Sequence, residues 1–188
     1  MEYVVPIKRV DQINRIKEIL KKQSKRDHLL FVFGINTGLN ISDLLLLKIS
    51  DIWEGEQTKD FLQLYDEKHK EVKKYYLNSK IEDAVKLYLN TKNEVFLDEY
   101  IFKSKKNNLP ITRQQAYRII NHAAREAGIT EKIGTHTLRK TFGYHAYKKG
   151  IAISILMSIY NHQTPAETFR YLGICKSDNY PVKVDVNL

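Results

Sequence analysis

The chain has 188 residues, a formal net charge of +9, 43% hydrophobic residues and one cysteine. This size and composition suit one domain with a real core and exclude an internal disulfide framework. No run of about 18 apolar residues predicts a transmembrane helix, and the first 20 residues lack the apolar core of a signal peptide. We therefore expect a cytoplasmic protein, and its positive charge favours a polyanionic partner, nucleic acid before an anionic membrane.

Three helices are predicted in the first quarter of the chain. Residues 10–25 place isoleucine and leucine side chains on one helical face. Residues 26–38 are apolar almost all round, which predicts a buried helix that ends at Gly38. Residues 41–48, ISDLLLLK, predict a short helix with Ser42 as its N-cap.

A small sheet is predicted next. Residues 61–66 and 72–78 are rich in aromatic and branched side chains and short enough for strands. The charged segment EKHKE between them predicts a hairpin turn. Residues 48–53, KISDIW, are the expected third strand of this antiparallel sheet.

The second half of the chain predicts helices with defined starts. Two helices are expected to open with capping boxes, one from Ser79 to Glu82 and one from Thr112 to Gln115. Residues 134–150 and 152–160 predict two more helices. The last helix, TPAETFRYL, has Thr164 as its cap with a proline at its first position. The predicted fold class is α+β and mainly α, a helical bundle with a small three-stranded antiparallel sheet.

Basic and titratable side chains gather in the segment GTHTLRKTFGYHAYKKG, residues 134–150. His136 and Arg139 are three residues apart, so they share one face of a helix. The planar guanidinium suits two oxygens of one phosphate, and an imidazole can donate a hydrogen bond or move a proton. Taken alone, this pair is more typical of a structural role or a solvated surface than of a phosphate site.

The order of motifs along the chain is more specific. His162 lies just before the start of the last helix, and Tyr171 follows nine residues later. The region HTLRKTFGYHAYKKG…IYNHQTPAETFRYLGI resembles the catalytic domain of the tyrosine recombinases, the phage integrase family. TGLNISDLLLLK resembles the first box of that family, and YDEKHKEVKKYYLN resembles its lysine-bearing hairpin. The resemblance covers residues 27–174, so the family's catalytic-domain fold is expected there.

The resemblance implies roles for individual residues. His136 and Arg139 would contact the scissile phosphate, and His162 would hydrogen-bond to the same phosphate. Tyr171 would attack phosphorus and form a 3′-phosphotyrosine. Lys68 at the hairpin tip would protonate the departing 5′-hydroxyl, with Lys70 as its rival.

One position departs from the family pattern. The first arginine of the family follows TGL, and this chain has Asn40 there, with Asp43 matching an acidic helper. Asparagine donates a hydrogen bond but carries no charge, so catalysis is expected to suffer. The alternative is that a nearby cation, Arg113 or Lys140, takes over the role.

The remaining expectations follow from the charge and from the resemblance. Lys140, Lys103, Lys105 and Lys106 would contact the DNA backbone, although a solvated loop explains the last three equally well. The histidines lack metal-ligand spacing, so we expect neither a metal nor another cofactor, and no small-molecule substrate. The expected partners are double-stranded DNA and further copies of the chain, because the family assembles as a tetramer on DNA.

The predicted organisation has three parts. Residues 1–26 would be an N-terminal helix of the same domain, 27–174 the catalytic domain, and 175–188 a C-terminal tail. The family's usual N-terminal clamp domain does not fit into 26 residues, so the chain is either a single-domain form or a fragment.

The expected function is site-specific DNA recombination or integration through cleavage and rejoining. The main alternative is a catalytically impaired relative that binds or regulates recombination sites, which Asn40 favours. A type IB topoisomerase shares the chemistry, but the spacing of His162 and Tyr171 argues against it.

Overall fold

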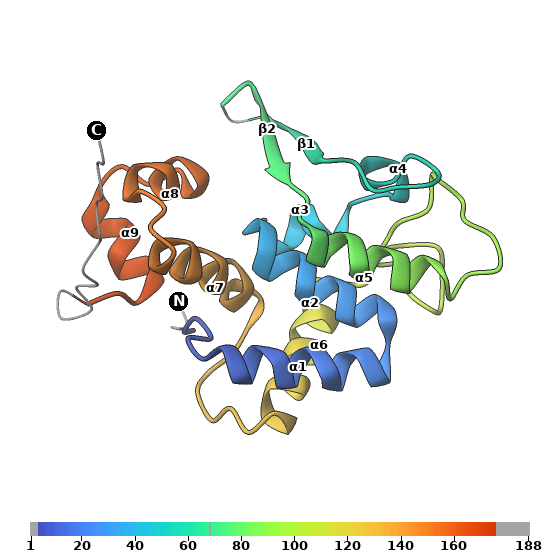
Figure 1. Cartoon of the computed structure of the whole chain (residues 1–188), viewed down its shortest axis with the longest axis horizontal. Coiled ribbons are helices and arrows are strands. Elements are labelled where there is room, and N and C mark those ends of the chain that lie inside the picture. Colours follow the sequence, from blue (N-terminus) through green and yellow to red (C-terminus); the bar gives the residue numbers. More distant parts are fainter. Residues whose placement is uncertain (1–3, 68, 176–188) are drawn as a thin grey trace, which may run out of the picture.

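The computed structural model describes residues 4–67 and 69–175, which form helices and one antiparallel hairpin (Figure 1). In chain order the elements are α1 (Val10–Gln23), α2 (Lys25–Thr37), α3 (Ile41–Leu45), α4 (Ile49–Ile52), β1 (Phe61–Asp66), β2 (Glu71–Tyr76), α5 (Ser79–Leu89), α6 (Arg113–Glu126), α7 (Thr135–Lys148), α8 (Ile153–Tyr160) and α9 (Pro165–Leu172). The predicted class, mainly helical with a small antiparallel sheet, is confirmed.

The sheet has two strands within the described residues, and the predicted third strand is wrong. β1 and β2 pair from Phe61 opposite Tyr76 to Asp66 opposite Glu71. Residues 49–52 instead form the helical turn α4. The Asp51 carboxylate accepts a 2.7 Å hydrogen bond from the backbone N–H of Lys48, which stabilises the first turn of a helix.

The predicted helix ends are partly confirmed. α2 ends at Gly38, which adopts the left-handed conformation with φ 68°. A side chain there would also meet the ring of Phe142 at 2.4 Å, so both the backbone and the packing require glycine. The capping box of α6 between Thr112 and Gln115 forms as predicted. Thr164 caps α9, and its hydroxyl accepts from the N–H of Glu167.

Two predicted N-caps are one or two residues too late. Asn40, not Ser42, caps α3, and its side-chain oxygen accepts a 2.9 Å hydrogen bond from the N–H of Asp43. Asn78, not Ser79, caps α5 and accepts from two backbone N–H groups. Asparagine and serine are equally good caps, so the extended backbone before each helix decided the start.

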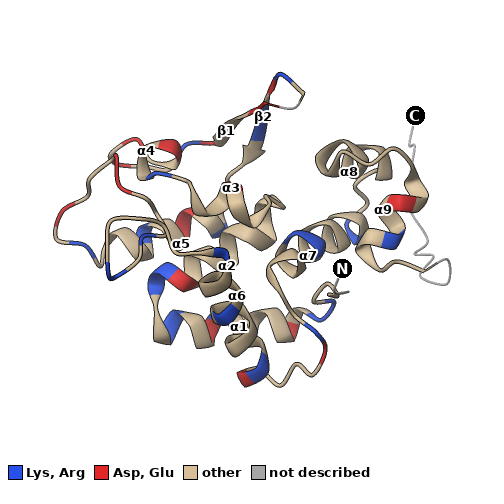
Figure 2. Cartoon of the chain, turned by 180° about the vertical axis from the view of Figure 1, so that it is seen from behind, with Lys and Arg blue, Asp and Glu red and all other residues tan. Residues whose placement is uncertain are grey.

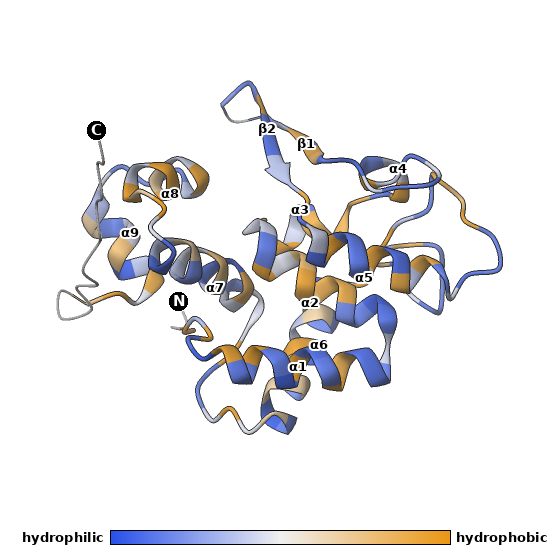
Figure 3. Cartoon of the chain, in the orientation of Figure 1, coloured by the Kyte–Doolittle hydropathy of each residue, from blue (hydrophilic) through white to orange (hydrophobic). Residues whose placement is uncertain are grey.

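The buried apolar side chains pack around α2. One group joins α2 to α3, α4, α5 and the hairpin, and a second joins α1, α2 and α6. Figure 3 shows apolar residues interspersed with hydrophilic ones along α1. α1 thus packs into the same body as the helices that follow it. The domain boundaries expected from the sequence stay a prediction.

The last two helices form a lobe of their own on α7. α8 and α9 lie to one side of α7, away from α1 and α5 (Figure 1). Their apolar cluster is centred on Leu156, Tyr160 and Leu172 and includes side chains of α7. Gly143 of α7 makes this approach possible, because a β-carbon there would clash with the Tyr160 hydroxyl.

Each helix in the described part of the chain is either too short or too polar to cross a bilayer.

The stability of the protein should depend on pH through the buried imidazole of His28. This imidazole is 9% exposed, its Nδ1 lacks a hydrogen-bond partner within the described residues, and burial lowers its pKa to about 4. Folding therefore disfavours the protonated ring. The free energy of unfolding should therefore carry no penalty from His28 above pH 6.5. It should fall by roughly 3 kcal/mol as the pH drops from 6.5 to about 4, because only the unfolded chain takes up the proton in this range. Urea unfolding at several pH values measures this loss.

His28→Leu should flatten that part of the pH profile, because the substituted side chain has no proton to gain. His122→Leu is the matched control, since the His122 side chain is 73% exposed. An equal flattening in the control, or an unchanged profile in His28→Leu, contradicts the assignment.

Gly143→Ala should destabilise the lobe of α8 and α9. The added methyl group would overlap the Tyr160 hydroxyl and Leu172, and overpacking of this kind costs roughly 1–3 kcal/mol. Tyr160→Phe removes the closest of these atoms, so the double variant should recover part of the loss. Thermal unfolding of the two single variants and the double variant gives the coupling, and additive losses would refute the contact.

Candidate active site

Arg139 lies where three segments meet. Its Nη2 donates a 2.9 Å hydrogen bond to the carbonyl of Ile159 at the end of α8, and its Nη1 donates to the carbonyl of Gly38 at the end of α2. The guanidinium carbon lies 4.6 Å from the centre of the Tyr160 ring. A planar cation with five donors suits this combination of stacking and forked donation. Arg139 is therefore fixed before any ligand arrives.

Three rings bring the C-terminal candidates together next to Arg139. The ring of Tyr171 lies 5.2 Å from that of His162 and 5.1 Å from that of Tyr160, between ring centres. The rings of Tyr160 and His162 are 5.5 Å apart. The structure thus places Arg139, His162 and Tyr171 around one aromatic side chain that the sequence analysis did not single out.

His162 is oriented by a threonine on α9. Its Nδ1 lies 3.0 Å from the hydroxyl of Thr168, which itself donates to the carbonyl of Thr164. The Thr168 hydroxyl donates its proton to the carbonyl of Thr164, so it can only accept a hydrogen bond from His162. We therefore infer that Nδ1 of His162 carries the proton and that Nε2 is an acceptor. Burial lowers the pKa of His162, and the charge of Arg139 adds to the shift while Glu167 opposes it. The neutral ring is favoured.

Tyr171 is protonated in this environment. Burial raises the pKa of its phenol, and Arg139 opposes the shift through its charge and a hydrogen bond. The same cation would stabilise a phenolate. A nucleophilic role therefore needs a proton acceptor close to the ring, and Nε2 of His162 is of the right kind.

His136 precedes Arg139 by one turn on α7 and is exposed. Desolvation lowers its pKa, followed by the charges of Arg113, Lys140 and Arg139. An exposed imidazole beside three cations is suited to an anionic ligand.

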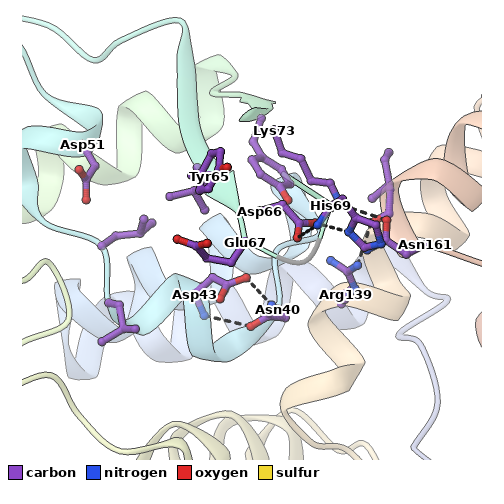
Figure 4. Close-up of a pocket in the computed structure, with 15 residues that line it drawn as sticks. Asn40, Asp43, Asp51, Tyr65, Asp66, Glu67, His69, Lys73, Arg139 and Asn161 are labelled. Carbon is purple, nitrogen blue, oxygen red and sulfur yellow. Dashed lines mark hydrogen bonds and ion pairs between the residues drawn. The ribbon is translucent and has the colours of Figure 1, made fainter. Parts of the chain in front are cut away.

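A cavity of about 570 Å³ opens beside Arg139, between α3, the hairpin and the end of α8 (Figure 4). Lys73 extends into it from β2, with Nζ 2.7 Å from a carboxylate oxygen of Asp66 and 3.0 Å from the side-chain oxygen of Asn161. The hairpin therefore contacts the loop that carries His162.

Asn40 and Asp43 bind each other at the wall of this cavity. Asn40 accepts from the N–H of Asp43 and donates to its carboxylate. Burial raises the pKa of Asp43, while the hydrogen bond from Asn40 and the charge of Arg139 oppose the shift. The cavity thus holds one guanidinium, one ammonium and several carboxylates, since Asp51, Asp66 and Glu67 also line it.

The lysines predicted from the sequence have different surroundings. Lys68 falls outside the described residues, and its rival Lys70 is exposed, with its amine 3.3 Å from Glu67. Lys140 was expected to contact DNA, but only 7% of it is exposed and its amine donates to the carbonyl of Val4. Its amine also lies 5.0 Å from the centre of the Tyr171 ring, so Lys140 is a nearly buried neighbour of Tyr171 and not part of an exposed basic surface.

The loop lysines are far from Arg139. Lys103 pairs with Glu99, and Lys105 and Lys106 are exposed. Their loop follows α5 at the opposite end of the molecule from α8 and α9 (Figure 1). Lysine and arginine are spread over most elements rather than confined to this loop (Figure 2). Among the described residues no cluster of three His, Cys, Asp or Glu side chains could hold a metal ion.

Three contributors escaped the sequence analysis: Tyr160, Thr168 and Lys73. The strand pattern of β2 could have indicated Lys73. Alternate residues of a strand share a face, so Lys73 lies on the same face as Tyr75, whose ring packs on the core, whereas Tyr76 on the other face is exposed. Tyr160 and Thr168 gave no such signal, since both are typical buried helix residues in the sequence.

The fold and the site have counterparts in known proteins. Residues 8–177 match the model of the phage integrase family. The chain is 42% identical over 174 residues to a probable integrase/recombinase, YoeC, of Bacillus subtilis, and the match covers 93% of this chain and 92% of YoeC. It is 27% identical to the tyrosine recombinase XerA of Pyrococcus furiosus, covering 87% of this chain and 56% of XerA.

Among solved structures, a crystal structure of XerA recombinase superposes with a TM-score of 0.74 at 22% identity, covering 95% of this chain and 61% of that one. This likeness shows a shared fold. The chain spans about half the length of the curated Xer recombinases that it matches. The family match covers nearly the whole chain and includes all the residues around Arg139. The chain therefore belongs to the phage integrase family, whose matched members include tyrosine recombinases.

Proposed function

We propose that the chain cleaves and rejoins DNA strands in site-specific recombination, with Tyr171 as the nucleophile. The observation that carries the proposal is the contact between the Tyr171 and His162 rings within the field of Arg139. A clamped phosphate diester beside these groups would meet a nucleophile, a proton acceptor and a fixed cation.

The chemistry balances without a cofactor. The Tyr171 oxygen forms a bond to phosphorus as the bond from phosphorus to the 5′-oxygen breaks, which leaves a 3′-phosphotyrosine. The phenol proton passes to Nε2 of His162, and the departing 5′-oxygen takes up a proton from a cationic donor, for which Lys68 stays the prediction. Arg139 and His136 neutralise charge on the nonbridging oxygens. Rejoining is the reverse reaction with a different 5′-hydroxyl.

Double-stranded DNA is the proposed substrate, and a cytoplasmic location is proposed with it. The net charge of +9 and the membership of the family support the first, and the single cysteine is consistent with the second. The assembly of several copies on DNA, as a tetramer, stays a prediction from the family.

A second candidate function, a catalytically impaired DNA-binding relative, is favoured by Asn40. Its side chain is engaged by Asp43 and brings no charge to a cavity that several carboxylates line. Carboxylates near a scissile phosphate oppose the negative charge that builds up on the phosphate oxygens during the reaction. Lys73 offsets part of this, but its amine is already bound to Asp66.

The proposed chemistry predicts a covalent adduct. Wild-type protein and a nicked suicide substrate that carries a validated target site should give a complex that survives denaturation. Tyr171→Phe should abolish the adduct, because phenylalanine has no nucleophilic oxygen, and should leave DNA affinity within about twofold. Tyr117→Phe, an exposed tyrosine on α6, is the matched control and should retain the adduct. An adduct that persists in Tyr171→Phe would falsify this nucleophile.

Asn40→Arg separates the two candidate functions. A guanidinium at this position adds a donor and a charge to the cavity, so the rate of adduct formation should rise by a factor on the order of 10². The exchange also removes the N-cap of α3, at a cost of about 1 kcal/mol in unfolding free energy. The rate is measured by single-turnover adduct formation.

Asn40→Lys is the control for charge alone and should raise the rate less, because an ammonium cannot donate to two oxygens in one plane. The gain must disappear in Asn40→Arg combined with Tyr171→Phe. If Asn40→Arg leaves the wild-type rate unchanged, the site does not lack a cation at that position.

A further inference from the structure

The N-terminal segment runs along α7 and reaches the helix of Tyr171. We refer to residues 4–8 as the N-terminal strap. Ile7 is 2% exposed, its N–H donates a 2.9 Å hydrogen bond to the hydroxyl of Thr141, and its carbonyl lies 2.9 Å from Nε2 of His145. The strap is therefore anchored on α7 through Thr141 and His145. Figure 1 shows the N-terminal segment next to α7.

A first lysine joins the strap to Tyr171. The amine of Lys140 donates a 2.8 Å hydrogen bond to the carbonyl of Val4 and lies 5.0 Å from the centre of the Tyr171 ring. The ammonium thus contacts the strap and the face of the candidate nucleophile at the same time. Lys140 is nearly buried, so both contacts are shielded from competing water.

A second lysine joins the strap to the end of α9. The amine of Lys8 donates a 3.1 Å hydrogen bond to the carbonyl of Gly173, which is the C-cap of α9 and follows Tyr171 by two residues. It also lies 5.1 Å from the Tyr144 ring on α7. A cation at this end complements the negative end of the helix dipole.

These links matter because α9 has few other supports. It packs on α7 and α8 but lies away from α1 and α5, so its lobe depends on α7 and on the strap (Figure 1). The carbonyl that holds Lys140 and the amine that holds Gly173 are both supplied by the strap. A shift of the strap would therefore be transmitted to both sides of Tyr171.

We propose that the N-terminal strap is a positioning element for Tyr171, acting through Lys8 and Lys140. The proposal rests on the proposed function for its effect on rate. Displacing the strap withdraws the carbonyl of Val4 from Lys140 and the amine of Lys8 from Gly173, and so loosens α9. Any partner or DNA contact that pulls on the strap would thereby change the readiness of the nucleophile.

The test compares Lys8→Met with Lys22→Met, which removes the same charge from an exposed position on α1. In the full chain, amide hydrogen exchange of residues 165–174 should be about two- to fivefold faster in Lys8→Met than in wild type. Lys22→Met should match wild type, and Lys8→Arg should restore slow exchange because it keeps a long cationic donor. Exchange in α1 and α2 should not change. Lys140→Met should accelerate exchange in the same residues by at least as much as Lys8→Met.

A rate measurement separates positioning from DNA contact. At saturating DNA, adduct formation should slow two- to fivefold in Lys8→Met while the dissociation constant for DNA equals that of Lys22→Met. Three results for Lys8→Met would overturn the proposal. The first is unchanged hydrogen exchange in residues 165–174. The others are a lower DNA affinity, or faster exchange, with an unchanged rate of adduct formation. If even wild type forms no adduct on a validated site, the proposed function fails, and the exchange data still decide whether the strap holds α9.

Discussion

The double donation of Arg139 is the interaction on which the site depends. One guanidinium binds the carbonyls of Gly38 and Ile159 and stacks on Tyr160, so it joins the end of α2, the end of α8 and α7 itself. Hydrogen bonds from a charged donor are each worth roughly 1.5–3 kcal/mol when partly shielded from water. The cost of holding a cation here is thus met before DNA binds, and the cation needs little reorganisation during catalysis.

The C-terminal lobe is built to bring a late segment of the chain to that cation. Gly143 lets α8 and α9 approach α7, the αL turn at Asn161 reverses the chain, and the Thr164 cap starts α9 with His162 just outside it. Because α9 is short, its position depends on contacts at both ends rather than on a large buried face. Small changes around such a helix would therefore shift Tyr171, the proposed nucleophile.

The polar residues that line the cavity beside Arg139 also have structural roles. Asn40 caps α3 well and binds Asp43, so it has a structural role whatever its effect on chemistry. Lys73 crosses to Asn161 and joins the hairpin to the C-terminal lobe. The Asp66 carboxylate pairs with Lys73, while the Asp43 carboxylate binds Asn40. Both carboxylates oppose an incoming phosphate. The cavity thus has less positive charge for a phosphate than a site in which two arginines face it.

The helical class and the ends of α2 and α9 follow from the amino-acid sequence, because capping residues are local signals. The convergence of His136, Arg139, His162 and Tyr171 was expected from the family resemblance. The structure brings Arg139, His162 and Tyr171 together, and the catalytic roles stay a prediction. The third strand expected at residues 48–53 was wrong, because the Asp51 carboxylate accepts from the N–H of Lys48 and residues 49–52 form a helical turn. The sequence could not show that Lys140 points inward or that Tyr160 stacks on Arg139. These two features depend on the folded structure, because the direction of a long side chain is set by the carbonyls and rings that distant segments bring within its reach.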